Sequence, residues 1–176
     1  MGIRTIAIMG IFLLTSCSVG LPSTPTSQNI TEPVKVVHGP GHATAVLLPV
    51  TIHGKGPFVF ELDTGASTSL IAPSLVKQFA LPQAGRSQTI SGIGGVQQAT
   101  PVTISNWQTG PIRLPATTIV SASIPLERGS GLDGLIGSDI WSRFGKFTLD
   151  YSSGTLTVYK QIALSASTNF RSLCRV

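Results

Sequence analysis

Residues 58–71 read FVFELDTGASTSLI, and this stretch decides the fold. In it an apolar run ends at the carboxylate of Asp63, which is followed by a hydroxyl, by a glycine able to turn tightly, and by a second apolar run that ends at Ile71. Short apolar runs bounded by turn residues are typical of strands rather than helices. The stretch therefore predicts two strands joined by a loop that carries a partly buried carboxylate.

The same pattern extends over residues 43–160, on both sides of this loop. Apolar bursts bounded by Gly, Pro, Asn or Ser recur, which predicts a succession of short strands. Pro73 suits an early helical position and Ser138 or Asp139 can cap a helix, so short helices are predicted at 73–79 and 138–144. Such a chain forms a small, mostly-β barrel or sandwich. The expected strands are 44–51, 58–62, 68–71, 89–93, 96–105, 112–120, 147–151 and 155–159, with hairpin turns at 53–56 and 151–154.

Length and composition narrow the class of protein. The chain has 176 residues, enough for one domain with some extra length. With 41% hydrophobic and only 11% charged residues a packed core is expected, and 19 Gly with 12 Pro exclude a coiled coil. The net charge of +5 comes from basic residues spread singly along the chain, which argues against a nucleic-acid surface. Two cysteines exclude a disulfide framework, and no histidine spacing suits a zinc site.

Two further segments carry information about function. Residues 132–140 read LDGLIGSDI and predict a short strand, Leu135-Ile136-Gly137, that runs into a helix. Residues 90–96 read ISGIGGV, a glycine-rich tip between flanks that favour strands. Glycines allow the positive φ and the opening that a lid needs. A phosphate loop would need a following Lys-Ser/Thr and the start of a helix, and neither is present in the sequence.

Taken in order, the Asp-Thr-Gly loop, the glycine-rich tip and the Leu-Ile-Gly strand resemble the retropepsin-like (retroviral-type) aspartic proteases over about residues 43–160. Ala66 after the Asp-Thr-Gly is similar to the retroviral type. The resemblance implies a small closed β-barrel of the acid-protease type and peptide-bond hydrolysis that needs no metal or other cofactor. Because that reaction needs two carboxylates and the chain holds a single Asp-Thr-Gly, the resemblance also implies a homodimer.

The same resemblance implies roles for individual residues. Two Asp63 carboxylates would share one proton and activate a water for attack on the scissile peptide. Thr64 would hydrogen-bond across the two-fold axis, and the Gly65 amide would donate to the carboxylate. An extended peptide would bind beneath the glycine-rich tips, which act as flaps. The expected substrate-binding residues are Gly92, Ile93, Gly94, Gly95, Leu135 and Ile136.

One departure from the family pattern concerns the base of the dimer. Retroviral proteases commonly carry Gly-Arg where this chain has Gly137-Ser138, so an ion pair that supports the dimer is missing. We interpret Asp139 as a helix cap or structural partner, and Glu61 as facing solvent or a cross-strand base.

The amino-terminal sequence predicts a secretory signal peptide. Arg4 precedes an apolar run that is too short to span a bilayer and that ends in Leu14-Thr15-Ser16-Cys17. This tetrapeptide resembles the lipobox of bacterial lipoproteins, which implies a signal peptide at 1–16 and a lipid anchor on Cys17. Ser18, in place of Asp, implies the outer membrane, with the domain facing the periplasm.

Two further segments lie outside the signal peptide and residues 43–160, and the first of them is polar. Residues 17–42 are punctuated by proline and are expected to form a flexible tether. Residues 161–176 are expected to be a tail, which holds the lone Cys174.

Two other functions stay open at this level. The domain could be a catalytically silent peptide-binding or assembly module of the cell envelope, or a structural lipoprotein whose Asp-Thr-Gly is accidental. The enzyme and the silent module differ in whether two Asp63 carboxylates ever meet. The expected partners are a peptide or protein substrate, a second copy of the chain and, through the anchor, a membrane.

Overall fold

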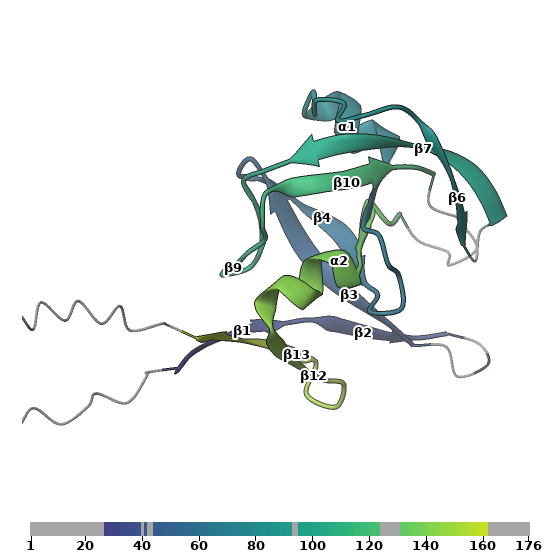
Figure 1. Cartoon of the computed structure of the whole chain (residues 1–176). Coiled ribbons are helices and arrows are strands. Elements are labelled where there is room, and N and C mark those ends of the chain that lie inside the picture. The colour runs from purple at the N-terminus through teal and green to yellow at the C-terminus, as the bar shows by residue number, and fades with distance from the viewer. Residues whose placement is uncertain (1–26, 40, 42–43, 93–94, 124–130, 162–176) are drawn as a thin grey trace, which may run out of the picture.

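The computed structural model describes residues 27–39, 41, 44–92, 95–123 and 131–161. Strands dominate these residues, as predicted, and the helices are short (Figure 1). No helix among the described residues is long and apolar enough to cross a membrane. The helices are α1 (Pro73–Gln78), α2 (Ser138–Trp141) and the 3₁₀ helix η3 (Ser142–Phe144). The strands are β1 (Ser27–Pro33), β2 (Lys35–His38), β3 (Thr44–Ile52), β4 (Lys55–Leu62), β5 (Leu70–Ile71), β6 (Gln88–Gly92), β7 (Gly95–Ile104), β8 (Trp107–Thr109), β9 (Ile112–Arg113), β10 (Thr117–Ser121), β11 (Gly134–Ile136), β12 (Lys146–Asp150) and β13 (Thr155–Gln161).

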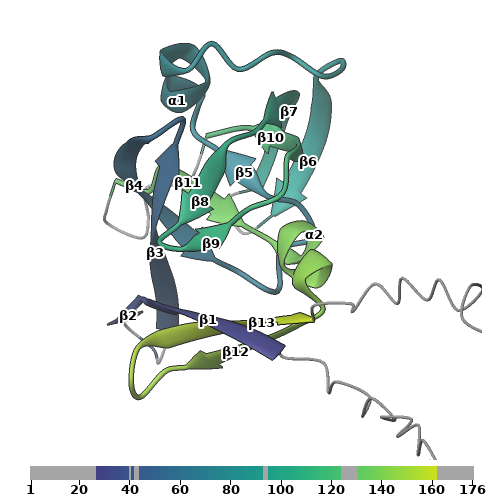
Figure 2. The same cartoon turned by 90° about the vertical axis from the view of Figure 1, so that its left-hand side faces the viewer.

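The strands form two sheets. The larger runs in the order β6-β7-β10-β5-β11-β4-β3-β8-β9, with β2 paired to β3 beside this path. The smaller has the order β1-β13-β12 and lies below the larger one in Figures 1 and 2. The mostly-β class is therefore confirmed. The expected closed barrel is wrong, because no sheet closes on itself within the described part of the chain. The path of the larger sheet ends at β6 and at β9, and these two end strands do not pair with each other.

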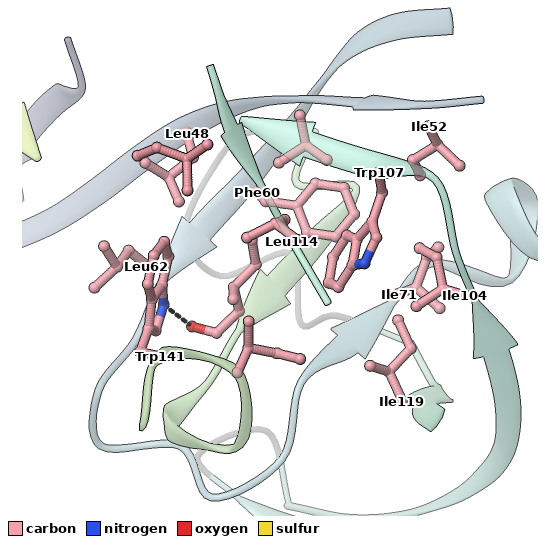
Figure 3. Packing of buried hydrophobic residues seen from close by; sticks show 14 of the residues in the cluster. Leu48, Ile52, Phe60, Leu62, Ile71, Ile104, Trp107, Leu114, Ile119 and Trp141 are labelled. Atoms are coloured by element: carbon pink, nitrogen blue, oxygen red, sulfur yellow. Dashed lines mark hydrogen bonds between the residues drawn. The ribbon is translucent and has the colours of Figure 1, made fainter. Parts of the chain in front are cut away.

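Alternation of side chains explains the central strand β3. Val46, Leu48, Val50 and Ile52 point to one face and are buried, because successive side chains of a strand point to opposite faces. These residues join Phe60, Trp107 and Trp141 in one apolar core between the sheets and helices (Figure 3). Each fully buried large side chain contributes about 1.5–3 kcal/mol. The core fixes the positions of the strands, and so of the loops between them that carry the polar and acidic side chains.

One predicted strand, 112–120, is broken into β9 and β10. Pro115 lies between the two pieces and has no N–H to donate to a strand ladder. Its carbonyl instead accepts a hydrogen bond from Trp107 Nε1 at 2.9 Å, and the Leu114 amide donates to the Trp107 carbonyl at 3.0 Å. The buried indole thus replaces a strand partner at the break. The other predicted strands and both helices are observed, although β5 is limited to Leu70–Ile71.

Part of the expected tether is also ordered into strands. Residues 27–33 form β1, which pairs along its whole length with β13, and β2 pairs with the first residues of β3. Ile30 lies opposite Val158 and packs against the core. The polar composition did not predict these strands, because they are held by pairing with β13 and β3 and not by a pattern of apolar residues of their own. Residues 17–26 and 162–176 lie outside the described residues.

Candidate active site

The candidate site is built where β11 passes between β4 and β5. β4 leads into the loop 63–69 and β5 leaves it, while β11 pairs parallel to β4 and antiparallel to β5. Gly134 of β11 lies opposite Phe60, and a Cβ at this position would overlap with the Phe60 ring. Only glycine therefore allows β11 to lie this close to β4. The strand predicted from Leu-Ile-Gly is thus observed as β11, directly beside the two strands that flank the Asp-Thr-Gly loop.

The Asp63 carboxylate is oriented by the turn that follows it. The Gly65 amide donates to Asp63 Oδ1 at 2.9 Å, as the resemblance implied, and the Ala66 amide donates to the same oxygen at 3.2 Å. The Asp63 amide donates to the carbonyl of Ile136 at 3.0 Å, which ties the start of the loop to β11. Asp63 is half-buried, whereas Thr64 and Gly65 are exposed. The tip of the loop therefore faces outward, with one carboxylate oxygen held by two amides.

The far end of the loop is held by α2. Ser69 is completely buried and donates its hydroxyl to Asp139 Oδ1 at 2.7 Å and its amide to Asp139 Oδ2 at 3.1 Å. The Gly137 amide donates to the Ser69 hydroxyl at 2.9 Å. Asp139 is therefore a structural partner, one of the two roles expected for it, and it makes no side-chain cap of α2. Sequence reasoning missed Ser69, because a serine in a polar loop carries no signal that an acid 70 positions away will bind it.

The glycine-rich segment forms the predicted hairpin. β6 and β7 pair antiparallel, with Gly92 opposite Gly95 as the last pair, and Ile93 and Gly94 lie outside the described residues. Gly95 has a φ of +90°, a backbone conformation that favours glycine. The middle of the hairpin is tied to the chain after β10, because Gln97, which lies opposite Ile90, donates its Nε2 to the Ser123 carbonyl at 2.9 Å.

A small apolar cluster connects this hairpin to the Asp63 loop. Ile90 of β6 and Leu70 of β5 both pack against a buried group formed by Ala99, Val120 and Ala122. β10 pairs with β7 on one side and with β5 on the other. The flap candidate and the exit of the loop therefore share one piece of core.

Three sequence expectations are changed or refined here. Ile136 is completely buried in the core and cannot line a substrate site on this surface, whereas Leu135 keeps part of its surface exposed. Glu61 is also buried, at 5% exposure, and the expectation that it faces solvent is wrong. It lies opposite Leu47 of β3 and Leu135 of β11, so it is covered because β4 is an interior strand with neighbours on both sides. Cys17, the expected lipidation site, lies outside the described residues.

Two other acids near the site, Asp133 and Asp139, are engaged in structure. Asp133 Oδ2 accepts a hydrogen bond from the Val59 amide at 2.9 Å, and the Asp133 amide donates to the Val59 carbonyl at 2.8 Å. These bonds hold the start of β11 to β4. Asp133 and Asp139 thus each hold the backbone of a neighbouring segment, whereas Asp63 stands at the start of a loop whose tip is exposed.

Comparisons with known proteins agree with this geometry. A family model described as aspartyl protease matches residues 48–140, just over half of the chain. Among solved structures, the chain is similar to a retropepsin-like aspartic protease from Rickettsia conorii, with a TM-score of 0.51 and 14% identity over 81% of this chain and 99% of that one. It is also similar to the retroviral protease-like domain of Ddi1 from Leishmania major, with a TM-score of 0.43 and 15% identity over 70% of this chain and 98% of that one. The comparison with curated proteins finds no match. The fold is retropepsin-like.

Proposed function

Because the chain belongs to the aspartyl protease family, we propose that it is an aspartic endopeptidase whose active form is a homodimer with two Asp63 side chains at one site. The observation that carries this proposal is the Asp63 loop itself. Its carboxylate is oriented by the Gly65 and Ala66 amides, and the loop tip with Thr64 faces outward, where a second copy can approach.

The second carboxylate comes from another copy of the chain. Hydrolysis by this chemistry needs two acids side by side, and the 176-residue sequence contains one Asp-Thr-Gly. The neighbouring acids Asp133 and Asp139 are bound to Val59 and Ser69 and are not free to move to Asp63. The Thr64 hydroxyl would bond to the partner loop and keep the two carboxylates in register.

In the dyad, one Asp63 side chain acts as the base and the other acts as the acid. Aspartic proteases are the standard example of two like carboxylates about 3 Å apart that share one proton, because both cannot be ionised at that distance. The ionised carboxylate takes a proton from water, whose oxygen bonds to the scissile carbonyl carbon, while the neutral carboxyl gives its proton to the carbonyl oxygen. The C–N bond then breaks as the amine nitrogen takes the proton that one carboxyl received from water, while one hydroxyl of the tetrahedral intermediate returns its proton to the other carboxylate and becomes the carbonyl of the product acid.

The proposal also includes a place in the cell. The lipobox-like Leu14-Thr15-Ser16-Cys17 supports a lipid anchor on Cys17 and a domain in the bacterial envelope, at the outer membrane and facing the periplasm. Acyl chains contribute about 0.8 kcal/mol per buried methylene, so several chains on one cysteine hold a protein firmly. Metabolic labelling with a palmitate analogue tests the anchor, since labelling that persists in Cys17→Ala would contradict it.

Peptide cleavage by the full chain in detergent tests the activity. The wild type, Asp63→Asn and the matched control Asp150→Asn are incubated with a mixed peptide library from acidic to neutral pH, and products are identified by mass spectrometry. Asp150 is exposed at the end of β12 and its carboxylate binds the following turn, so its variant should cleave as the wild type does at a temperature where both are folded. Asp63→Asn should lose activity roughly 100-fold or more, because the dyad supplies both the acid and the base. Cleavage by Asp63→Asn at the wild-type rate would remove the proposal.

A further inference from the structure

The start of α2 touches the Asp63 loop at a second point besides Ser69. The Ser138 amide donates to the Ala66 carbonyl at 2.8 Å, and the Ser138 hydroxyl donates to the same oxygen at 2.9 Å. A Cβ built on Gly137 would lie 2.7 Å from that carbonyl oxygen, so the backbone of the two segments is in close contact. Both lone pairs of the Ala66 carbonyl are thus used by one residue.

Ala66 is also the residue that reaches Asp63. Its amide donates to Asp63 Oδ1 at 3.2 Å, next to the Gly65 amide. The amide and the carbonyl of Ala66 belong to the two peptide groups that share its Cα. Fixing the carbonyl therefore restricts the orientation of the amide that points at the carboxylate.

The helix α2, which carries Ser138, is held firmly in place. Ile140 and Trp141 of α2 are buried in the core, and Trp141 Nε1 donates to the Ile136 carbonyl at 3.0 Å (Figure 3). On the outer side, Arg143 Nε donates to the Asp139 carbonyl at 3.1 Å and Arg143 Nη2 to Thr117 Oγ1 at 3.0 Å, which ties the helix to β10. Because these contacts hold the helix at both ends, the Ser138 hydroxyl keeps a fixed position relative to the Asp63 loop.

We propose that Ser138 is a positioning residue for Asp63: its hydroxyl holds the Ala66 carbonyl, and through the Ala66 amide it fixes the direction of the Asp63 carboxylate. Its catalytic consequence rests on the proposed function. The contact lies within one protomer, so each copy brings its carboxylate already oriented to the dimer. A displacement of about 1 Å at a reacting group can cost up to a hundredfold in rate, and loss of one of two bonds to the carbonyl should cost less.

The test compares Ser138→Ala with Ser142→Ala in the full chain. Ser142 is exposed one turn further along, so the control makes the same chemical change in the same helical segment. We expect Ser138→Ala to lower kcat about tenfold with KM unchanged, and Ser142→Ala to leave both as in the wild type. A second pair, Ser138→Thr and Ser138→Val, has nearly equal side-chain volume and differs in the hydroxyl. Thr should restore kcat and Val should not.

Hydrogen exchange of the Gly65 and Ala66 amides, followed by NMR, provides a readout that needs no peptide cleavage. Exchange should become about fivefold faster in Ser138→Ala and Ser138→Val and remain at the wild-type rate in Ser138→Thr. Unchanged exchange in both hydroxyl-free variants would overturn the positioning role, as would faster exchange with unchanged kcat. A wild type that cleaves no peptide would refute the proposed function, and the exchange rates alone would then decide whether Ser138 orients the loop.

Discussion

Replacing Gly134 by alanine tests the packing that places β11 beside the Asp63 loop. The added Cβ would overlap with ring carbons of Phe60, a side chain with 0% exposure. The ring has no room to turn away, because its other side meets Trp107 edge-on with 6.3 Å between centroids. The backbone of β11 is also held, by β4 on one side and β5 on the other.

The cost follows from this lack of freedom. Overpacking a tight core costs typically about 1–3 kcal/mol, and here neither the ring nor the strand can yield, so we expect about 3 kcal/mol. With a urea slope of about 2 kcal/mol/M, the unfolding midpoint should fall by about 1.5 M. Gly131→Ala is the matched control, because a Cβ at Gly131 has nothing within 4 Å, and it should change stability by less than about 0.5 kcal/mol.

A double-mutant cycle in urea, followed by tryptophan fluorescence, isolates the contact. In a Phe60→Leu background the overlapping ring carbons are gone, so Gly134→Ala should cost about 1–2 kcal/mol less than in the wild type. The reasoning is refuted if Gly134→Ala unfolds at the wild-type midpoint, or if its cost is the same in both backgrounds.

Further predictions concern single polar groups, each checked by thermal or urea unfolding. Burial raises the pKa of the Glu32 carboxyl, so the stability that its neutral form contributes is fully present at acidic pH and is lost as pH rises above about 4.5. Glu32→Gln should remove this decline in stability with pH and unfold at a higher temperature or urea concentration than the wild type at pH 7. An equal decline in the variant would contradict the assignment. The Thr109 hydroxyl is buried without a partner among the described residues, so Thr109→Val should stabilise the protein by about 1 kcal/mol, and destabilisation would show that the hydroxyl is bound. Hydrogen bonds from the side chain of Ser152, and from Ser153, lower the pKa of Asp150 to about 2, so their stabilisation is present above pH 3.8 and is lost as pH falls toward 2; Asp150→Asn should be less stable than the wild type at neutral pH, with the difference vanishing in acid.

Local patterns in the sequence predicted most strands and both helices. Alternation along β3 and the turn residues between β12 and β13 act over a few residues, so they can be read without knowing the rest of the fold. The Asp-Thr-Gly loop and the strand that threads beside it were predictable for a related reason, since both carry short, distinctive residue orders.

What the sequence could not predict depends on partners far along the chain. The strand β1 exists because β13 lies beside it, more than a hundred residues away, and the burial of Glu61 follows from the pairing of β4 with β3 and β11. The bonds from Ser138 to Ala66 likewise join positions 72 residues apart. A polar residue gives no local sign of such a contact in the sequence, because the same side chain can equally well hydrogen-bond to water on the surface.

Mixed subunits test the requirement for two Asp63 carboxylates most directly. Wild-type and Asp63→Asn chains are unfolded together in equal amounts, refolded, and assayed for peptide cleavage at a fixed total concentration. Random pairing into symmetric dimers leaves two carboxylates in about one quarter of the sites, so the account predicts about one quarter of the all-wild-type activity. An activity of about one half would mean that each chain acts alone, and would contradict the account.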